Sequence, residues 1–214
     1  MEKHKVIQTR QLTDLTFVVR MERKQLNFQT GQFVTLGLNG ATDRREYSVY
    51  SGENDDYLEV LVREVESGKI SAKLKRLNAG DAVYVDGPFG FFKFAPSNFE
   101  VQKFLFIATG TGISPFHSFV RTHNDFDYQL VHGVRFAEEA YDHRDFNPER
   151  LTLCTSGDRK GDFYGRVTTY LAEQNIDAET NCFLCGNSEM IYEVFDILTG
   201  KGIPVSNIYS EVYF

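Results

Sequence analysis

The segment RREYSVYS, residues 44–51, brings an arginine, aromatic rings and hydroxyl groups together within a few positions. If the segment is a strand, alternation places Arg45 and Tyr47 on one face and Ser48 on the other. An arginine binds phosphate by charge-assisted hydrogen bonds, a tyrosine ring offers a flat stacking surface, and a serine hydroxyl forms hydrogen bonds. The pattern is typical of a site for a planar, phosphate-bearing cofactor, with ordinary sheet surface as the alternative.

Two glycine-containing turns follow apolar strands in the second half, in FLFIATGTGISP (104–115) and CGNSEM (185–190). The absence of side chains at Gly110, Gly112 and Gly186 lets backbone amides approach a pyrophosphate or a flat ring, and a following helix N-terminus favours anions. The spacing GTGxxP differs from the dinucleotide fingerprint GxGxxG, so each turn alone also fits a structural role. Two such strand ends predict one ligand that spans them.

A third apolar strand is followed by the charged segment TSGDRKGDFYGR (155–166). Its hydroxyl and cations, which are Ser156, Arg159, Lys160 and Arg166, suit a phosphate. A solvated loop with charges of both signs is the alternative.

The three cysteines, Cys154, Cys182 and Cys185, do not suggest a disulfide framework. Cys182 and Cys185 form a CxxC, which can be a redox dithiol or half of a metal site, but no second CxxC supplies further ligands. We therefore expect no metal site, and the alternative to a redox role is two small residues in an apolar strand.

The first half of the chain shows short strand patterns separated by turn signals, which predict an antiparallel barrel or sandwich. The predicted strands are TFVVRM (16–21), GQFVTLGL (31–38), REYSVYS (45–51), YLEVLVREV (57–65), AVYVDG (82–87) and FFKF (91–94). One helix is predicted over 67–80, where Ile70, Leu74 and Leu77 recur at helical spacing. This helix would cap the barrel.

After residue 98 the pattern changes to buried strands that alternate with helices, which predicts a doubly wound parallel α/β sheet. The strand patterns are KFLFIAT (103–109), YQLVHGV (128–134), LTLC (151–154), CFLCGN (182–187) and the terminal NIYSEVYF (207–214). We expect two domains, a β-barrel over residues 1–98 and an α/β domain over residues 99–214.

The formal net charge of -7 disfavours nucleic acid and anionic membranes as partners. The first residues lack the apolar core of a signal peptide, and no run of about 18 apolar residues occurs. We expect a cytoplasmic protein that binds no membrane and is a monomer or a weak dimer.

Six motifs occur in the order found in one family, and together they cover nearly the whole chain. They are REYS (45–48), GKISAKL (68–74), GPFG (87–90), GTGISP (110–115), CGNSEM (185–190) and EVYF (211–214). With these motifs the sequence resembles the ferredoxin (flavodoxin)-NADP reductase family of flavoproteins. The resemblance implies an FAD-binding barrel and an NAD(P)-binding parallel sheet.

The resemblance also assigns roles to residues. Arg45 should hold the flavin pyrophosphate, Tyr47 should lie against the isoalloxazine, and Ser48 should form a hydrogen bond near N5. Further flavin contacts are expected from Val60, Leu61, Val62, Gly68, Ile70 and Ser71. Contacts to the pyridine nucleotide are expected from Gly110, Thr111, Arg135, Thr155, Ser156, Arg159, Arg166, Gly186 and Met190.

The reaction implied by the resemblance is hydride exchange between NADP(H) and FAD, followed by one-electron transfer. The nicotinamide would lie beside Thr111, Cys185 and Glu211, so Ser48, Cys185 and Glu211 are the expected catalytic residues. In this family a terminal aromatic ring often occupies the nicotinamide position. The chain ends with Tyr213 and Phe214, and Tyr213 is the slightly favoured candidate.

Two departures bear on the cofactors. Ser48 is followed by Val49 rather than by the Asn or Asp typical of FMN-using oxygenase reductases, which favours FAD. Thr155 is followed by Ser156 where many NADPH-specific bacterial relatives have an arginine. NADP(H) is therefore expected from the displaced cations and from the habit of the family, with NAD(H) as the alternative.

The expected partner is a separate ferredoxin or flavodoxin, because three cysteines cannot supply the four thiolates of an iron-sulfur domain. The same count argues against a fused oxygenase reductase. A free flavin reductase and a separate reductase component of an oxygenase are the enzymatic alternatives. A non-enzymatic binding module that kept only the fold is less favoured.

Overall fold

The computed structural model describes residues 1–214 except 39–42, 66–67, 69, 95–101, 124–125 and 214. The chain divides into two compact units. Met1–Ala95 and Ser114–Thr122 form the first, and Pro96–Ile113 and His123–Phe214 form the second. The predicted boundary between residues 98 and 99 lies outside the described residues.

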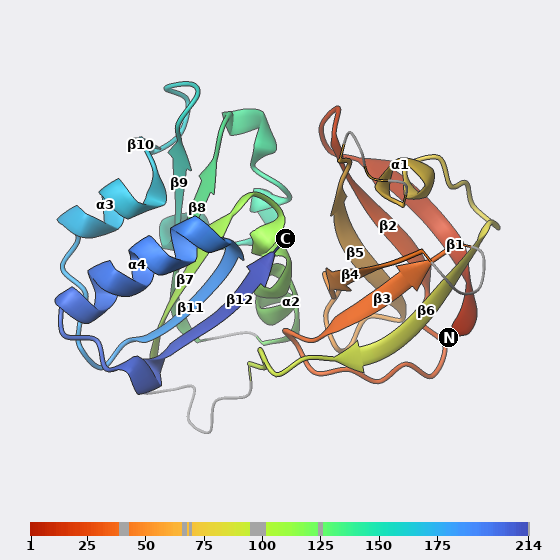
Figure 1. Cartoon of the computed structure of the whole chain (residues 1–214), viewed down its shortest axis with the longest axis horizontal. Coiled ribbons are helices and arrows are strands. Elements are labelled where there is room, and N and C mark those ends of the chain that lie inside the picture. The colour runs from red at the N-terminus through yellow and green to blue at the C-terminus, as the bar shows by residue number, and fades with distance from the viewer. Residues whose placement is uncertain (39–42, 66–67, 69, 95–101, 124–125, 214) are drawn as a thin grey trace. The chain divides into compact units, whose positions relative to one another are not determined.

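The first unit contains an antiparallel sheet of order β4-β3-β6-β1-β2-β5 (Figure 1). Its strands are β1 (Glu2–Gln11), β2 (Thr16–Glu22), β3 (Phe33–Gly37), β4 (Arg44–Ser48), β5 (Tyr57–Arg63) and β6 (Ala82–Phe89). An isolated bridge between Val49 and Val60 joins the two outer strands, so the sheet closes into the predicted barrel. Alternate residues of the strands fill its apolar core, including Val19, Val34 and Val60.

Two predictions for this unit were wrong, and one strand was missed. Strand β1 was not predicted, because its segment EKHKVIQTRQ carries charged and polar residues at most positions. The predicted helix over 67–80 is reduced to α1 (Ser71–Leu74), and the turn that follows is closed by a bond from the Leu77 amide to the Leu74 carbonyl. FFKF (91–94) forms no strand, although Phe92 and Phe94 are buried there.

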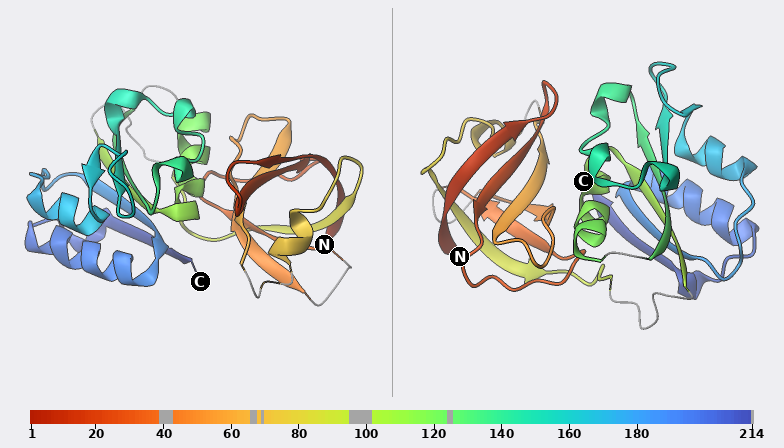
Figure 2. Two further views of the ribbon diagram at one scale, coloured as in Figure 1. Left: turned by 90° about the horizontal axis from the view of Figure 1, so that it is seen from above. Right: turned by 180° about the vertical axis from the view of Figure 1, so that it is seen from behind.

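The second unit contains a parallel sheet of order β10-β9-β8-β7-β11-β12. Its strands are β7 (Lys103–Thr109), β8 (Asp127–Val134), β9 (Leu151–Thr155), β10 (Phe163–Tyr164), β11 (Asn181–Asn187) and β12 (Ile208–Tyr213). Helices α3 (Val167–Glu173) and α4 (Ser188–Gly200) lie side by side on one face (Figures 1 and 2). Two residues of β8 contact the irregular segment between β8 and β9: His132 contacts His143, and Tyr128 accepts a hydrogen bond from the Asn147 amide. This segment contains three short 3₁₀ turns.

The 3₁₀ turn η1 (Gly110–Ile113) continues directly into α2 (Ser114–Thr122), and α2 belongs by its contacts to the barrel unit. The Ser118 hydroxyl donates to the Ser51 carbonyl at 2.7 Å, and Arg121 forms an ion pair with Asp55 at 2.9 Å. The ring of His117 stacks on Tyr50 with centroids 3.8 Å apart. Helix α2 therefore contacts the segment between β4 and β5 of the barrel unit.

Candidate functional site

The strand order reverses at β7 and β11, because β7 continues to β8 on one side while β11 and β12 lie on the other. Open parallel sheets bind ligands beyond the carboxyl ends of the strands at such a point. Here the turn after β7 contains Gly110 and Thr111, and β11 carries Cys185 and Gly186 near its carboxyl end. The structure thus brings together the two glycine turns that the sequence placed at one ligand.

The two turns touch through their backbones. A Cβ atom on Gly112 would lie 2.3 Å from the Cys185 carbonyl oxygen, and one on Gly186 would lie 2.3 Å from Thr109 Oγ1. The Asn187 amide also donates to Thr109 Oγ1 at 3.2 Å. Gly112 is therefore needed for close packing of the turn on β11, whereas sequence reasoning assigned its small size to the approach of a ligand.

Cys185 and Glu211 are directly opposite each other in the ladder between β11 and β12. The Cys185 side chain is fully buried, and burial holds the pKa of its thiol well above the usual value. The negative charge of Glu211 raises this pKa further, while a hydrogen bond with Tyr213 opposes the rise. Cys185 is therefore a neutral thiol, suited to contact with a ring and not to attack as a thiolate.

The CxxC is not a dithiol in this structure. Cys182 and Cys185 are three positions apart on β11, so they point to opposite faces of the sheet. Cys182 packs in the apolar cluster under α3 and α4, and all three cysteines are free and buried. This placement fits the alternative, in which Cys182 and Cys185 are two small residues of an apolar strand.

The loops after β8 and β9 form a second part of the site in the same unit. The Ser156 amide donates to the Val134 carbonyl, and the Gly157 amide donates to the Arg135 carbonyl at 2.6 Å. The Asp158 carboxylate accepts from the Ala137 amide at 3.1 Å. These bonds tie the two loops together at the carboxyl edge of the sheet.

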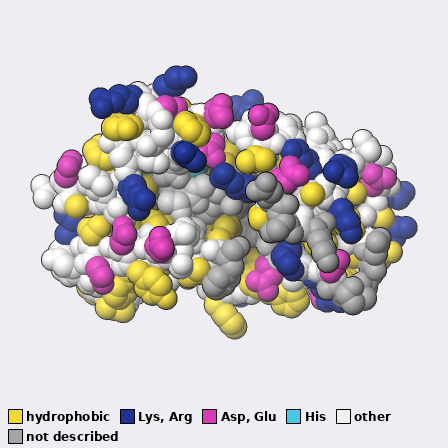
Figure 3. All heavy atoms as spheres, turned by 45° about the horizontal axis from the view of Figure 1, so that its top comes forward, with side chains coloured by type: hydrophobic (Ala, Val, Ile, Leu, Met, Phe, Trp, Pro, Cys, Tyr) yellow, Lys and Arg dark blue, Asp and Glu magenta, His cyan; other side chains and the backbone are white. Residues whose placement is uncertain are grey.

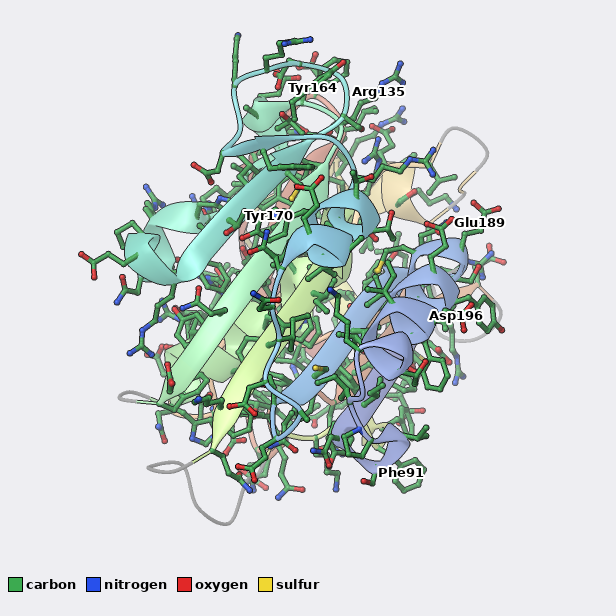
Figure 4. The ribbon with its side chains drawn as sticks, turned by 90° about the vertical axis from the view of Figure 1, so that its left-hand side faces the viewer. Phe91, Arg135, Tyr164, Tyr170, Glu189 and Asp196 are labelled. Carbon is green, nitrogen blue, oxygen red and sulfur yellow. The ribbon has the colours of Figure 1, made fainter. Side chains whose placement is uncertain are left out.

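Arg135 and Arg159 are exposed on these loops, and Arg166 is exposed at the start of α3. Thr155 is buried, with its hydroxyl bonded to the Asp158 carbonyl. The Arg159 guanidinium lies over the Tyr164 ring at 4.6 Å, and Arg135 and Tyr164 lie at the same end of the sheet (Figure 4). A cation held on an aromatic face is oriented without being neutralised. The arrangement can bind an anionic group.

In the barrel, β4 contains Arg45, Tyr47 and Ser48 of the segment RREYSVYS. Tyr47 is opposite Val34 in the β3–β4 ladder and packs at the edge of the barrel core, half-buried. Burial raises the pKa of its hydroxyl to about 12. Arg45 is exposed and donates to the Arg44 carbonyl at 2.7 Å, whereas Ser48 is only 4% exposed. A neutral ring beside an exposed guanidinium fits a planar phosphate-bearing group.

Strands β4 and β5 meet at one bridge, and their ladder does not continue toward Arg45. Strand β5 is the last strand of the sheet order and pairs with β2, so within the described part of the barrel its other edge is bridged only at Val60. Backbone donors and acceptors on such an edge are available to a ligand. This edge suits the predicted backbone contacts of residues 60–62, whose side chains fill or cover the core.

The turn before α1 brings Gly68, Ile70 and Ser71 together. The Ser71 hydroxyl accepts from the Val65 amide at 3.1 Å, and a Cβ on Gly68 would lie 2.7 Å from the Ser71 Oγ. The turn is too tight for a side chain at Gly68. The three residues expected at the pyrophosphate therefore share one turn of the barrel unit.

Two predicted residues stand apart from these groups. Met190 packs in the apolar cluster under α4, and its amide donates to the Asn187 side chain at the helix start. Phe214 lies outside the described residues. Sequence reasoning also missed His132, which contacts the Gly110 turn, because one histidine within an apolar strand carries no pattern.

Two family models match the chain, an oxidoreductase FAD-binding domain over residues 2–94 and an oxidoreductase NAD-binding domain over residues 106–195. Among the described residues, no helix is both long enough and apolar enough to cross a membrane.

Curated relatives include the toluate 1,2-dioxygenase electron transfer component of Pseudomonas putida, which is 28% identical over 95% of this chain, and the chain spans 65% of that protein. The ferredoxin--NADP reductase of Azotobacter vinelandii is 26% identical over 94% of this chain and 90% of its own length. A solved ferredoxin NADP+ reductase from Neisseria gonorrhoeae with bound FAD and NADP has a TM-score of 0.85 and 24% identity, covering 100% of this chain and 98% of that one.

Proposed function

Because the chain belongs to the ferredoxin (flavodoxin)-NADP reductase family of flavoproteins, we propose that it exchanges hydride between NADP(H) and FAD and electrons with a separate ferredoxin or flavodoxin. The observation that carries the proposal is the contact between the two glycine turns at the sheet's switch point. The β11–β12 ladder places Glu211 opposite Cys185 beside this contact. A reductase of this kind would act in the cytoplasm.

FAD, when bound, accepts hydride at N5 and releases electrons one at a time. The barrel residues bind and orient it. Arg45 pairs with the pyrophosphate, Tyr47 stacks on the ring system, and the Ser48 hydroxyl forms a hydrogen bond near N5. The outer edge of β5, at Leu61 and Val62, supplies backbone hydrogen bonds to the ring.

The second unit positions the nicotinamide with Thr111, Cys185 and Glu211. A neutral thiol gives the ring a soft, uncharged contact, and the adjacent carboxylate favours the positive charge of the oxidised nicotinamide. Tyr213 is the ring proposed to occupy the nicotinamide position before the nucleotide enters. Such alignment can lower the activation barrier by about 7 to 11 kcal/mol.

The proposal is tested by titrating the FAD-loaded protein with NADPH and with NADH, and then offering ferredoxin and flavodoxin as acceptors. We expect NADPH to bleach the visible absorption of the flavin and one of the acceptors to restore it. If neither nucleotide bleaches the flavin, the proposed function is wrong. Free FAD as the preferred acceptor would favour the flavin reductase alternative.

Arg159 is the residue proposed to recognise the 2'-phosphate of NADPH, because it is exposed and held on the Tyr164 ring. We expect Arg159→Ala to raise the KM for NADPH about tenfold or more and to leave the KM for NADH nearly unchanged. Steady-state kinetics with both nucleotides measures this.

The matched control for Arg159 is Lys103→Ala. Lys103 is exposed and begins β7, so it lies at the amino edge of the same parallel sheet. It should change neither KM. Equal losses with both nucleotides in Arg159→Ala would contradict the role of this arginine in selecting NADPH.

The proposal of a ferredoxin or flavodoxin as acceptor does not depend on a large basic surface patch. Lys and Arg side chains are interspersed with Asp and Glu on the face shown in Figure 3. On the cap turn, Lys75 is paired with Glu64 at 2.6 Å, while Lys73 lies in α1 and Arg76 follows it. These cations and Lys69, which lies outside the described residues, are proposed to meet an acidic ferredoxin. An oxygenase component is the alternative acceptor, given the toluate dioxygenase relative.

A further inference from the structure

A chain of two histidines ends on the backbone of the nucleotide turn. His132 lies on β8 with its side chain fully buried, and its Nε2 is 2.9 Å from the Gly110 carbonyl oxygen. Its Nδ1 is 2.8 Å from Nε2 of His143, which lies in a 3₁₀ turn of the same unit. No role in the proposed chemistry uses either ring.

The partners of the rings determine their tautomers. A carbonyl oxygen only accepts hydrogen bonds, so His132 must carry its proton on Nε2. The Nδ1 atom of the neutral ring then has a lone pair, and His143 must donate to it from Nε2. Burial lowers the pKa of His132 to about 3 and that of His143 to about 4, which agrees with two neutral rings.

The bond to Gly110 acts on the peptide that follows. Gly110 has a φ of 52°, a left-handed conformation that side chains rarely adopt, and a Cβ there would meet nothing within 4 Å. A peptide is planar, so the direction of the Gly110 carbonyl sets that of the Thr111 amide. His132 therefore adds a side-chain hydrogen bond to a peptide whose first residue has a backbone conformation that favours glycine.

We propose that His132, held in its Nε2–H tautomer by His143, is a positioning residue that sets the Gly110–Thr111 peptide for the nicotinamide end of the dinucleotide. The inference rests on the proposed function, since it concerns the same turn. It adds a residue that need not touch the nucleotide and acts through the backbone.

The test compares His132→Phe, which loses the donor, with His132→Gln, whose amide can donate from a similar position. In stopped-flow reduction of the FAD-loaded protein by NADPH, we expect His132→Phe to slow the reduction about tenfold and His132→Gln to recover most of the rate. The flavin spectrum before mixing should not change. His143→Phe should give an intermediate rate, because it frees the tautomer of His132.

The control is His4→Phe, because His4 is also a buried histidine bonded to a backbone carbonyl, that of Glu22, but lies in the barrel. It should leave reduction by NADPH unchanged. In addition, ¹⁵N NMR of histidine-labelled protein should show the Nε2–H tautomer of His132 in the wild type and a mixture in His143→Phe.

The inference is overturned if His132→Phe reduces at the wild-type rate or if the wild type shows the Nδ1–H tautomer. If His132→Phe does not fold, His143→Phe and the NMR spectrum decide. If neither nucleotide reduces the flavin of the wild-type protein, the proposed function fails. The inference is then still tested by NMR, through the tautomer of His132 and the shift of the Thr111 amide signal on addition of NADP⁺.

Discussion

Gly112→Ala is expected to slow flavin reduction by NADPH about 100-fold while the barrel still binds FAD. The new methyl group would lie 2.3 Å from the Cys185 carbonyl oxygen and 2.8 Å from the Gly186 Cα. Both are backbone atoms, so no side-chain rotation relieves the clash, and the turn and β11 must move apart. A displacement of about 1 Å at a reacting centre can cost this factor.

Stopped-flow absorbance measures the reduction rate, and flavin content after purification measures FAD binding. The control is Gly200→Ala at the end of α4, where a Cβ meets nothing within 4 Å and should be neutral or slightly stabilising. A Gly112→Ala variant that reduces at the wild-type rate would show that the contact between the two turns does not align the nucleotide.

Tyr47→Ala is expected to weaken FAD binding by about tenfold to 100-fold, because stacking on an aromatic ring contributes about 1 to 3 kcal/mol. Tyr47 also covers the barrel core, so the variant should lower the melting temperature. Tyr47→Phe keeps the ring and should retain FAD.

Arg45→Ala should weaken FAD binding by a comparable factor, because the contact with phosphate is lost. It should not lower the melting temperature, since Arg45 is exposed.

Equilibrium titration of the FAD-free protein, followed by flavin fluorescence, gives the affinities. Glu46→Ala is the matched control, since Glu46 is exposed on the same strand and points to the other face. If both Tyr47→Ala and Arg45→Ala bind stoichiometric FAD with normal affinity, β4 is not part of the flavin site.

The sequence predicted burial better than it predicted pairing. In FFKF the alternation is real, since Phe92 and Phe94 are buried and Phe91 is 99% exposed, but no strand lies beside the segment in a ladder. In β1 the opposite holds. Only His4 and Val6 are buried, yet the segment pairs with both β2 and β6. A strand with two neighbours needs backbone partners and not a continuous apolar stripe.

The candidate site could be predicted in part. Glycine turns at strand ends imply a ligand at the carboxyl edge, but the ladder position that sets Cys185 against Glu211 depends on how β11 and β12 align. The contact of His132 with Gly110 joins residues 22 positions apart through an irregular loop and a single ring, so no periodicity predicts it.

Helix α2 gives the two halves of the chain an interleaved connection. The polypeptide enters the second unit, returns to the first for residues 114–122, and leaves again. Phe119 stacks on Phe94 with centroids 4.6 Å apart, so the barrel obtains part of its apolar surface from sequence beyond its last strand. A protease that cut the chain between β6 and β7 would therefore leave a barrel fragment without α2, and a second fragment carrying an apolar helix whose barrel partners had been removed. The two halves of this chain therefore cannot be exchanged independently with those of relatives. In a chimeric protein, α2 and the barrel must come from the same protein.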